Sequence, residues 1–398
     1  MTGPPLLTMP CRACGHDVPA GKFCGLCGAR LTRDSGRGPD WLRVSDYAAA
    51  PSESVLQPSI VSSVFPHLPE RSHGAFRAGL ALMLTVLVVF ALAGWQVPII
   101  AVGTLGPLLI FGIYLFETGV VADLPRWIWV LTVVLGIVVG AVWVWTTTNI
   151  FAQSYGMALG AAQTPDIWMI LKGIVIPFGG VLVMQIPAAL VVLIRPRHHR
   201  EALDGFAVGV LGATTFAASA TLLRLIPQFK SGVFTQAQPL LDLLIGTGIL
   251  GVTMPLSVAA FGGVIGAGLW YATGRRGVRR VRLFVVVALV LVFFAAAYTG
   301  VGLTDLFPLP LGLQFGKHVV MALVVLAAMR VALQLALLRE RDDETAPESP
   351  ILCPHCGHVV PDMTFCPACG VAAHASCRAS REARRADRPQ PVEQEAER

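Results

Sequence analysis

Long stretches of apolar residues, separated by short polar segments, fill the chain between residues 78 and 338. Their lengths are compatible with the roughly 20 residues, within a range of about 17–25, that an α-helix needs to cross the hydrocarbon core of a bilayer. The pattern predicts eight transmembrane helices, at 78–94, 97–116, 127–147, 168–194, 205–226, 239–272, 282–303 and 315–338.

The sixth stretch contains 34 residues, which as a straight helix would be roughly 50 Å long and too long for one span. Gly246, Gly248, Gly251 and Pro255 predict a break within it. We therefore expect a short re-entrant or interfacial piece, followed by a true span that starts near residue 254.

Composition supports a membrane protein. Hydrophobic residues make up 55% of the 398 residues and charged residues only 14%, and the mean hydropathy is +0.67. Ordinary soluble domains are far more polar. Of the 30 basic residues, 4 are Lys and 26 are Arg, and Ala, Gly and Val are abundant. This bias is typical of a high-GC bacterial genome, so the expected location is a bacterial plasma membrane.

Basic residues gather on alternate loops, which predicts the orientation of the spans. Loops 148–167 and 304–314 contain no Lys or Arg, and 227–238 contains only Lys230. Cytoplasmic loops are enriched in Lys and Arg, so both termini are expected in the cytoplasm, and no cleavable signal peptide is expected. The net charge of +6 then reflects topology and anionic headgroups, and nucleic acid is not favoured as a partner. The loop arginines are Arg195, Arg197, Arg200, Arg275, Arg276, Arg279, Arg280 and Arg282.

The same 18-residue cysteine pattern occurs near both ends of the chain. Ten of the 18 positions are identical, among them Val18 and Val360, and Phe23 and Phe365. Two C-x-x-C-G knuckles supply four thiolates for one tetrahedral Zn²⁺. We therefore predict two structural zinc sites, whose ligands are Cys11, Cys14, Cys24 and Cys27 in one block and Cys353, Cys356, Cys366 and Cys369 in the other.

The fold class expected from both patterns is an all-α polytopic membrane bundle with a small β zinc ribbon at each terminus. A ribbon this short can bury little besides one Val and one Phe, so the metal must supply its folding energy, about 10 kcal/mol. A disulfide-stapled domain is the alternative, but it suits an oxidising compartment. His16 and His358 could compete as ligands, although we interpret them as surface residues of the knuckles. Cys377 is assigned no role.

The expected organisation has six parts. The ribbons occupy 9–30 and 351–372, and the transmembrane domain occupies 75–338. Residues 31–74 are rich in Ser, Pro, Arg and Asp and are expected to be a flexible linker. A shorter charged linker, 339–350, precedes the second ribbon, and residues 373–398 are expected to be a disordered charged tail.

Ionisable residues within the spans are few, and they form no evident pair or proton relay. Lys172, Arg224 and His318 lie near predicted span ends and can reach the interface. Asp242 lies in the broken sixth segment. Arg330 lies deeper and could hydrogen-bond across the bundle together with Gln334.

Glycines in the spans show small-x-x-x-small spacing, which favours close helix packing. The pairs are Gly136 and Gly140, Gly205 and Gly209, and Gly262 and Gly266. We interpret them as packing positions in preference to the lining of a cavity or pore.

Within residues 100–280, two segments carry a resemblance to a known family. Asp204–Gly209, followed by Thr215–Ala217, resembles the D-G-x-x-x-G…G-F-A segment of the PrsW-type intramembrane proteases. Pro255–Ser257, through Gly266 to Arg275 and Arg276, is similar to that family's P-x-x-x-H-A…G segment and basic exit. The resemblance implies a helical protease domain.

The residues that the resemblance would make catalytic are absent. The family's E-E-x-x-K would fall in Pro177–Gln185, where no Asp or Glu occurs, and its later acid falls at Ala220. The histidine after Pro255 would be Ala259, and the late H-x-x-x-D, near Ala295–Thr299, lacks both residues. Without carboxylate or imidazole such a site cannot activate water. No catalytic residue is assigned, and a true relative would be a pseudo-protease.

Three functions remain open from the sequence. The favoured one is a non-enzymatic membrane protein whose cytosolic ribbons bind a cytosolic or membrane protein partner, with the bundle as anchor or pseudo-protease. The second is an active intramembrane protease with a non-standard site. The third is a transporter or channel, although the bundle shows neither an intramembrane charge chain nor an evident repeat.

Overall fold

The computed structural model describes residues 7–31, 44–51, 53–57, 59–69, 72–155, 167–194, 200–231, 239–304, 310–340 and 345–388. The chain forms two compact units. The terminal unit comprises Met1–His73, Phe116–Asp123 and Gln334–Arg398, and the helical unit comprises Gly74–Leu115 and Leu124–Leu333.

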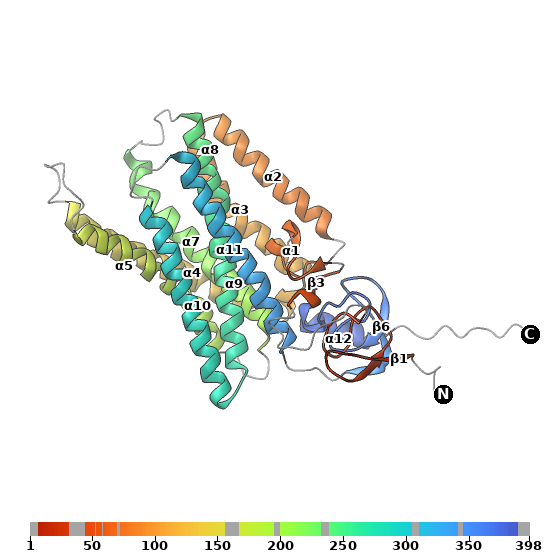
Figure 1. Ribbon diagram of the computed structural model, residues 1–398. Helices are drawn as coiled ribbons and strands as arrows, with labels where there is room; N and C mark the ends of the chain where they lie inside the picture. The colour runs from red at the N-terminus through yellow and green to blue at the C-terminus, as the bar shows by residue number, and fades with distance from the viewer. Residues whose placement is uncertain are drawn as a thin grey trace, which may run out of the picture. The chain divides into compact units, whose positions relative to one another are not determined.

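In the described part of the chain, eight helices are long and apolar enough to cross a membrane, the predicted number, so the chain is a multi-pass membrane protein. Figure 1 shows how these helices are arranged. Six of them are single helices, and the fourth and the sixth are each made of two consecutive helices. In chain order they are α2 (His73–Leu92), α3 (Gln96–Glu117), α4 (Arg126–Tyr155), α5 with α6 (Ile167–Val183 and Ile186–Ile194), α7 (Ala202–Ser231), α8 with α9 (Leu240–Gly248 and Met254–Thr273), α10 (Gly277–Thr304) and α11 (Leu311–Leu338).

The sixth span is interrupted where the break was expected, just before residue 254, but the chain does not reverse there. A single π turn, Ile249–Thr253, joins α8 to α9, and the residues flanking it keep right-handed helical backbone angles. Pro255 explains the wider turn, because proline lacks an N–H and its ring clashes with the carbonyl four residues earlier in a regular helix. The re-entrant form of the expected piece was wrong, because the helix passes the proline without ending. An interfacial position of α8 stays a prediction.

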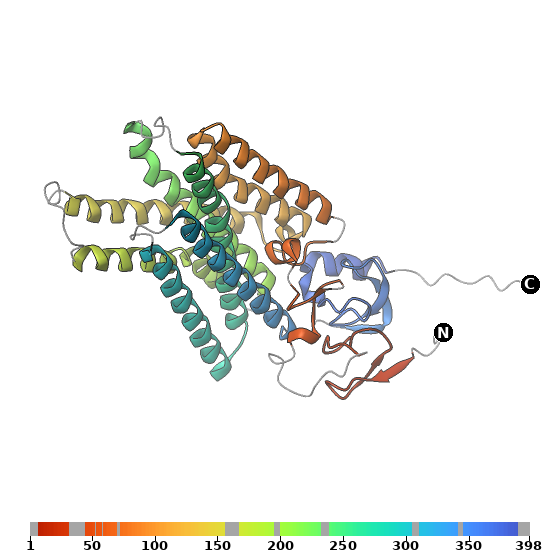
Figure 2. The ribbon, with the colours of Figure 1, turned by 45° about the horizontal axis from the view of Figure 1, so that its top comes forward.

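Glycines bring α7 and α9 into close contact, as their spacing predicts. A methyl group added at Gly266 would lie 2.8 Å from the Cα atom of Gly209, and one added at Gly262 would lie 2.5 Å from the carbonyl oxygen of Gly209. The two helices run side by side in both views (Figures 1 and 2). Since lipid provides little hydrophobic drive between helices, such close packing of small residues is what holds two spans together.

Helix α7 also packs on α4, through the glycine pair Gly136 and Gly140. A methyl group at Gly140 would lie 2.7 Å from the carbonyl oxygen of Phe216, and one at Gly136 would collide with Thr215. Ser219 also donates a hydrogen bond of 3.0 Å to the carbonyl oxygen of Ile137. Helix α7 is the most enclosed of the eight spans, and it forms the centre of the helical unit.

Part of the segment expected to be a flexible linker is folded. Residues Ala48–Ala50 (β3) pair antiparallel with Glu53–Ser54 (β4), and Ile60–Val64 form the short helix α1. Ser62 donates a 2.6 Å hydrogen bond to Glu53, which joins the hairpin to α1. Gln334, expected to bond within the bundle, donates instead to the carbonyl oxygen of Ala48 at 3.2 Å. Residues 32–43 of the predicted linker lie outside the described residues.

The prediction that the tail is disordered is also wrong for its first half, because Arg378–Ala386 form a helix, α12. Arg385 and Arg388 both form ion pairs with Asp362, at 3.0 and 3.1 Å, and the side chain of Asp362 is 1% exposed. The mixed charge of the tail therefore serves packing. Residues 341–344 of the second linker and 389–398 of the tail lie outside the described residues.

Substituting Gly209 with Leu tests the packing of α7 on α9. The new side chain would meet the backbone of α9. We therefore expect the free energy of unfolding to fall by about 1–3 kcal/mol, the usual cost of overpacking. The measurement is thermal unfolding of the purified protein in detergent. Gly112→Leu is the control, because a methyl group at Gly112 meets no other atom within 4 Å; equal losses in the two variants would contradict the packing role.

Candidate metal centres in the paired ribbons

Each cysteine block folds as a small antiparallel ribbon. In the N-terminal ribbon, Thr8–Pro10 (β1) pairs with Asp17–Pro19 (β2), and in the C-terminal ribbon, Ala346–Leu352 (β5) pairs with Val359–Asp362 (β6). The second half of each block closes through one further bridge, Phe23 with Arg30 and Phe365 with Ala372. The strands hold the two C-x-x-C knuckles of each ribbon opposite each other.

All four knuckles have the same backbone geometry. In each, the glycine after the second cysteine adopts a positive φ, between 68° and 77°, which a residue with a side chain adopts only at a cost. That glycine donates its N–H to the carbonyl of the first cysteine, at 2.8 Å for Gly15, 2.9 Å for Gly28 and Gly357, and 2.8 Å for Gly370. These glycines let the chain turn around a central point.

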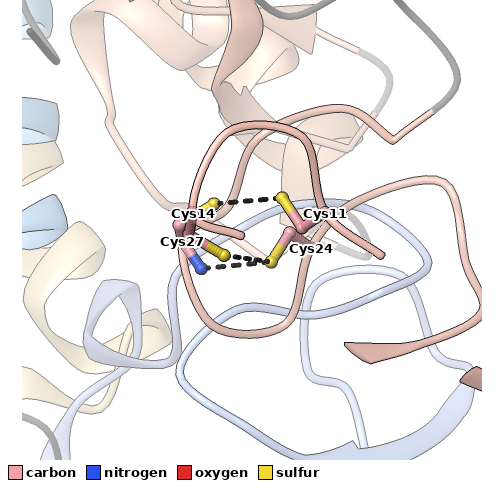
Figure 3. A group of neighbouring side chains, drawn as sticks. All are labelled: Cys11, Cys14, Cys24 and Cys27. Carbon is pink, nitrogen blue, oxygen red and sulfur yellow. Dashed lines mark hydrogen bonds between the residues drawn. The ribbon is translucent and has the colours of Figure 1, made fainter. Parts of the chain in front are cut away.

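The four thiols of each ribbon converge on one point (Figure 3 shows the N-terminal group). Within each group all four sulfur atoms lie within 4.8 Å of one another. The Sγ atoms of Cys11 and Cys27 are 3.8 Å apart, and those of Cys353 and Cys369 are 3.9 Å apart. A regular tetrahedron of sulfurs around Zn²⁺, with bonds of about 2.3 Å, has edges of about 3.8 Å.

The same distances exclude the disulfide alternative for these residues. All nine cysteines lie in the described part of the chain and are free thiols, and the measured separations are close to twice a disulfide bond length of about 2.05 Å. The donor set therefore fits a tetrahedral thiophilic dication, and four thiolates would leave no coordination position for water.

Hydrogen bonds within each group lower the pKa of one of its thiols. The Cys27 thiol, together with backbone N–H groups, lowers the pKa of Cys24 to about 5 in spite of burial. In the other ribbon, hydrogen bonds from Cys366 and Cys369 lower the pKa of Cys353 far below its usual value, and the shared bond raises the pKa of Cys366 to about 12. Hydrogen bonding thus favours the thiolate form of Cys24 in one group and of Cys353 in the other, which is the form that binds a metal ion.

The histidines of the knuckles lie outside the groups of converging thiols. His16 and His358 are exposed, and a nitrogen of His16 is 3.0 Å from the carbonyl oxygen of Cys14, as expected for surface residues. His355, which the sequence did not single out, is buried inside the C-terminal knuckle, and this burial lowers its pKa to about 4. Its ring packs edge-on against His67 at 6.4 Å, so we assign it a packing role.

The two ribbons pack against each other with local twofold symmetry. Residues 342 positions apart are equivalent, and the contacts come in equivalent pairs. Phe23 donates its N–H to the carbonyl oxygen of Pro367 at 3.0 Å, and Phe365 donates its N–H to that of Gly25 at 2.9 Å. The ring of Phe365 lies over Gly28, and the ring of Phe23 lies over Gly370.

This pairing changes the role of the two phenylalanines. Each was expected to fill the core of its own ribbon, and each instead covers the last knuckle of the other ribbon, where it is 6% (Phe23) or 2% (Phe365) exposed. Burying a Phe side chain contributes about 1.5–3 kcal/mol. The duplicated blocks therefore form one double ribbon.

Helix α12 extends the C-terminal ribbon. Besides the ion pairs with Asp362, Arg381 donates a 2.6 Å hydrogen bond to the carbonyl oxygen of Ser376. Cys377, assigned no role from the sequence, is the N-cap of α12, and its sulfur accepts from the N–H of Ser380 at 3.4 Å. No sequence pattern within the tail marks Asp362 as its partner, so this contact could not be predicted.

The double ribbon predicts a zinc content of two per chain. Cys14→Ser and Cys356→Ser should each lower the content to about one, because three thiolates bind the metal much more weakly than four, and the double variant should retain none. Plasma emission spectrometry of the purified protein measures the content. Cys377→Ser is the matched control and should keep both ions; a wild-type content near zero would contradict both sites.

No protein-family model, no curated protein and no solved structure matches this chain. The resemblance to PrsW-type proteases therefore has no support beyond the residues quoted for it. What the fold and the site do support is a zinc-ribbon type of membrane protein, with eight apolar helices and two four-cysteine groups that could bind metal ions.

Proposed function

We propose that this chain is a non-enzymatic protein of the bacterial plasma membrane whose two zinc ribbons form one cytosolic module that binds a protein partner. The observation that carries the proposal is the reciprocal packing of Phe23 and Phe365 across the double ribbon. Two metal-dependent folds joined in this way make a rigid surface, and rigidity lowers the entropic cost of binding.

A catalytic role for the metal is disfavoured by the donor set. Catalytic zinc sites have three protein ligands and an open position for water or substrate, whereas these groups each offer four thiols. Zinc held in this way contributes folding energy instead of Lewis acidity. The metal sites therefore support a binding module better than an enzyme.

Nucleic acid is a poor candidate for the partner. The C-terminal helix α12 is rich in Arg, yet Arg385 and Arg388 are paired with Asp362, and Arg384 donates hydrogen bonds to Ser376 and Ser380 at 2.9 and 3.1 Å. Arginines engaged within the protein are not available to neutralise phosphates. A protein partner fits the double ribbon better.

The helical unit serves as the membrane anchor in this proposal. A pseudo-protease that holds a membrane client is the narrower alternative, and it rests on Asp204–Gly209 and on Gly266. Close packing of α7 on α9 already accounts for Gly205, Gly209 and Gly266, so these glycines need no family relationship to explain them. The anchor role is therefore preferred.

The cytosolic orientation is supported by chemistry and by loop charge. Eight free thiols arranged for metal suit a reducing compartment, and the arginine-rich loop after the sixth span belongs on the cytoplasmic side. In the terminal unit the two ends of the chain also contact each other, as expected if both lie on one side of the membrane.

A pull-down from bacterial cytosol and solubilised membranes tests partner binding. The full-length chain is immobilised in nanodiscs, and we expect proteins that bind wild type to be lost from Cys14→Ser and Cys356→Ser, because the ribbons unfold without metal. Cys377→Ser is the control and should bind as wild type does. If wild type and both ribbon variants bound the same proteins in equal amounts, the proposal would be contradicted.

The same preparation separates the binding module from a protease. Labelled membrane substrates should remain intact on incubation with wild type. Cleavage that requires metal or an acidic residue of the helical unit would instead favour an enzyme with a non-standard site.

A further inference from the structure

We propose that the C-terminal ribbon is a metal-dependent latch on the loop between α3 and α4, so that its metal state restrains the membrane helices. The proposal rests on the proposed function only in taking the C-terminal thiol group as a metal site. The contact itself, between Phe116–Asp123 and α12, lies within the terminal unit.

Asp123 at the end of this loop caps the N-terminus of α12. Its two carboxylate oxygens accept hydrogen bonds from the backbone N–H groups of Arg378, at 2.7 Å, and Ala379, at 2.9 Å. The first N–H groups of a helix have no partner within the helix, and the helix dipole favours an anion there. A carboxylate 255 residues away in the chain thus completes a helix that could not cap itself fully.

The loop also covers the thiol beside this cap. Cys377 is 1% exposed, and a methyl group added at Gly119 would lie 3.0 Å from its sulfur. Gly119 has a φ of +73°, so the close approach and the turn both favour glycine there. The other end of the loop is held by Ser72, which donates a 2.7 Å hydrogen bond to Glu117.

A continuous set of contacts connects this cap to the metal site. Asp362 ends β6, four residues before Cys366, and its buried carboxylate binds Arg385 and Arg388 of α12. The ribbon has too small a core to keep β6 in place without metal. Loss of metal should therefore remove Asp362 as a partner, free α12 and release Asp123.

The loop held by α12 is directly continuous with two membrane spans. Glu117 is the last residue of α3, and α4 begins at Arg126, three residues after Asp123. Holding this short loop fixes the ends of two spans, and releasing it removes that restraint. A partner or a thiol oxidant that disturbs the C-terminal ribbon would act on α3 and α4 in the same way.

The alkylation rate of Cys377 reports whether the latch is closed. In the zinc-loaded full-length protein in nanodiscs, maleimide labelling of the Cys377 peptide is followed by mass spectrometry. Asp123→Asn should raise the rate about three- to thirtyfold, the range that corresponds to loss of a cap. Cys356→Ser, which leaves the loop unchanged, should raise it at least as much. Asp17→Asn, at an exposed carboxylate of the other ribbon, should leave it as in wild type.

Two outcomes would overturn the latch. An unchanged rate in Asp123→Asn shows that the cap does not hold α12, and an unchanged rate in Cys356→Ser after loss of its metal shows that the latch does not depend on metal. Zinc content is measured in the same samples. Wild type without zinc would refute the proposed metal sites, while the Asp123 comparison would still decide whether the loop holds α12.

Independently, the arginine cluster at the turn from α9 to α10 points to a binding site for anionic phospholipid headgroups. Five arginines occupy Arg275–Arg282, and no Asp or Glu occurs between Asp242 and Asp305. Arg276, Arg279 and Arg282 are exposed. Clusters of this density next to a span bind anionic lipid, because Arg pairs well with phosphate oxygens.

Apolar residues in the same turn favour a lipid over a free anion. Val278 and Val281 alternate with the arginines and are 69% and 63% exposed, as suits side chains that enter the boundary between headgroups and acyl chains. The guanidinium groups of Arg275 and Arg280 lie 4.8 and 5.5 Å from the ring centres of Tyr271 and Phe284, which holds them at the ends of their spans. The first N–H groups of α10, which begins at Gly277, add positive potential.

Native mass spectrometry of the full-length protein from phosphatidylglycerol nanodiscs tests this site. Replacing Arg276, Arg279 and Arg282 together with Gln should reduce retained phosphatidylglycerol about tenfold or more. Replacing Arg77, Arg126 and Arg224 removes the same charge and should leave retention near that of wild type. Equal retention by both triple variants would overturn the site, and displacement of the lipid by millimolar inorganic phosphate would overturn the choice of a lipid ligand.

Discussion

The arrangement of four thiols around one point is the constraint on which the terminal unit depends. The ribbons bury only a few apolar side chains, and the cost in conformational entropy of ordering their backbones is about 1–2 kcal/mol per residue. Neither can meet that cost from its own core. In each ribbon a tetrahedral dication supplies the missing free energy at the point where the four thiols of its two knuckles converge. The glycines at positive φ let the chain turn so that the thiols meet there.

Pairing of the ribbons then buries the apolar surface that metal binding alone leaves exposed. Metal binding folds a ribbon but leaves its phenylalanine and last knuckle exposed to water. The equivalent ribbon provides the complementary surface, so Phe23 covers Gly370 while Phe365 covers Gly28. A self-complementary contact of this kind is the usual geometry of a twofold dimer, here made by two parts of one chain. The membrane spans are held together in a different way. Gly209, Gly262 and Gly266 let the backbones of α7 and α9 approach closely in lipid, where burial of apolar surface gives no advantage.

Local patterns predicted much of this architecture, and distant contacts account for what they missed. The number of spans, the small β ribbons and the close packing at the glycine pairs each depend on residues within a few positions of one another, and each was confirmed. The folded structure of the hairpin β3–β4 and of α12 depends on partners far away in the chain: Ala48 accepts a hydrogen bond from Gln334, and Arg378 donates one to Asp123. A run of Ser, Pro and Arg looks disordered when such partners are not known, because its own composition cannot bury enough apolar surface. The π turn before Pro255 was missed for a different reason, as a proline predicts a disturbed helix without specifying how the helix adapts.

Contact between the two ribbons also constrains how the helices cross the membrane. Residues 22–25 touch Pro367 and Phe365, so both ends of the chain lie on one side, and the number of spans between them must be even. Counting the composite sixth helix, Leu240–Thr273, as one crossing and α5 with α6 as another gives eight spans, which satisfies this condition. If α8 crossed separately from α9 there would be nine spans, and if α5 and α6 formed a re-entrant pair there would be seven. The loop from Phe116 to Asp123, which follows two crossings, also meets the C-terminal helix. The cysteine ribbons thus fix the parity of the membrane topology independently of the charge of its loops.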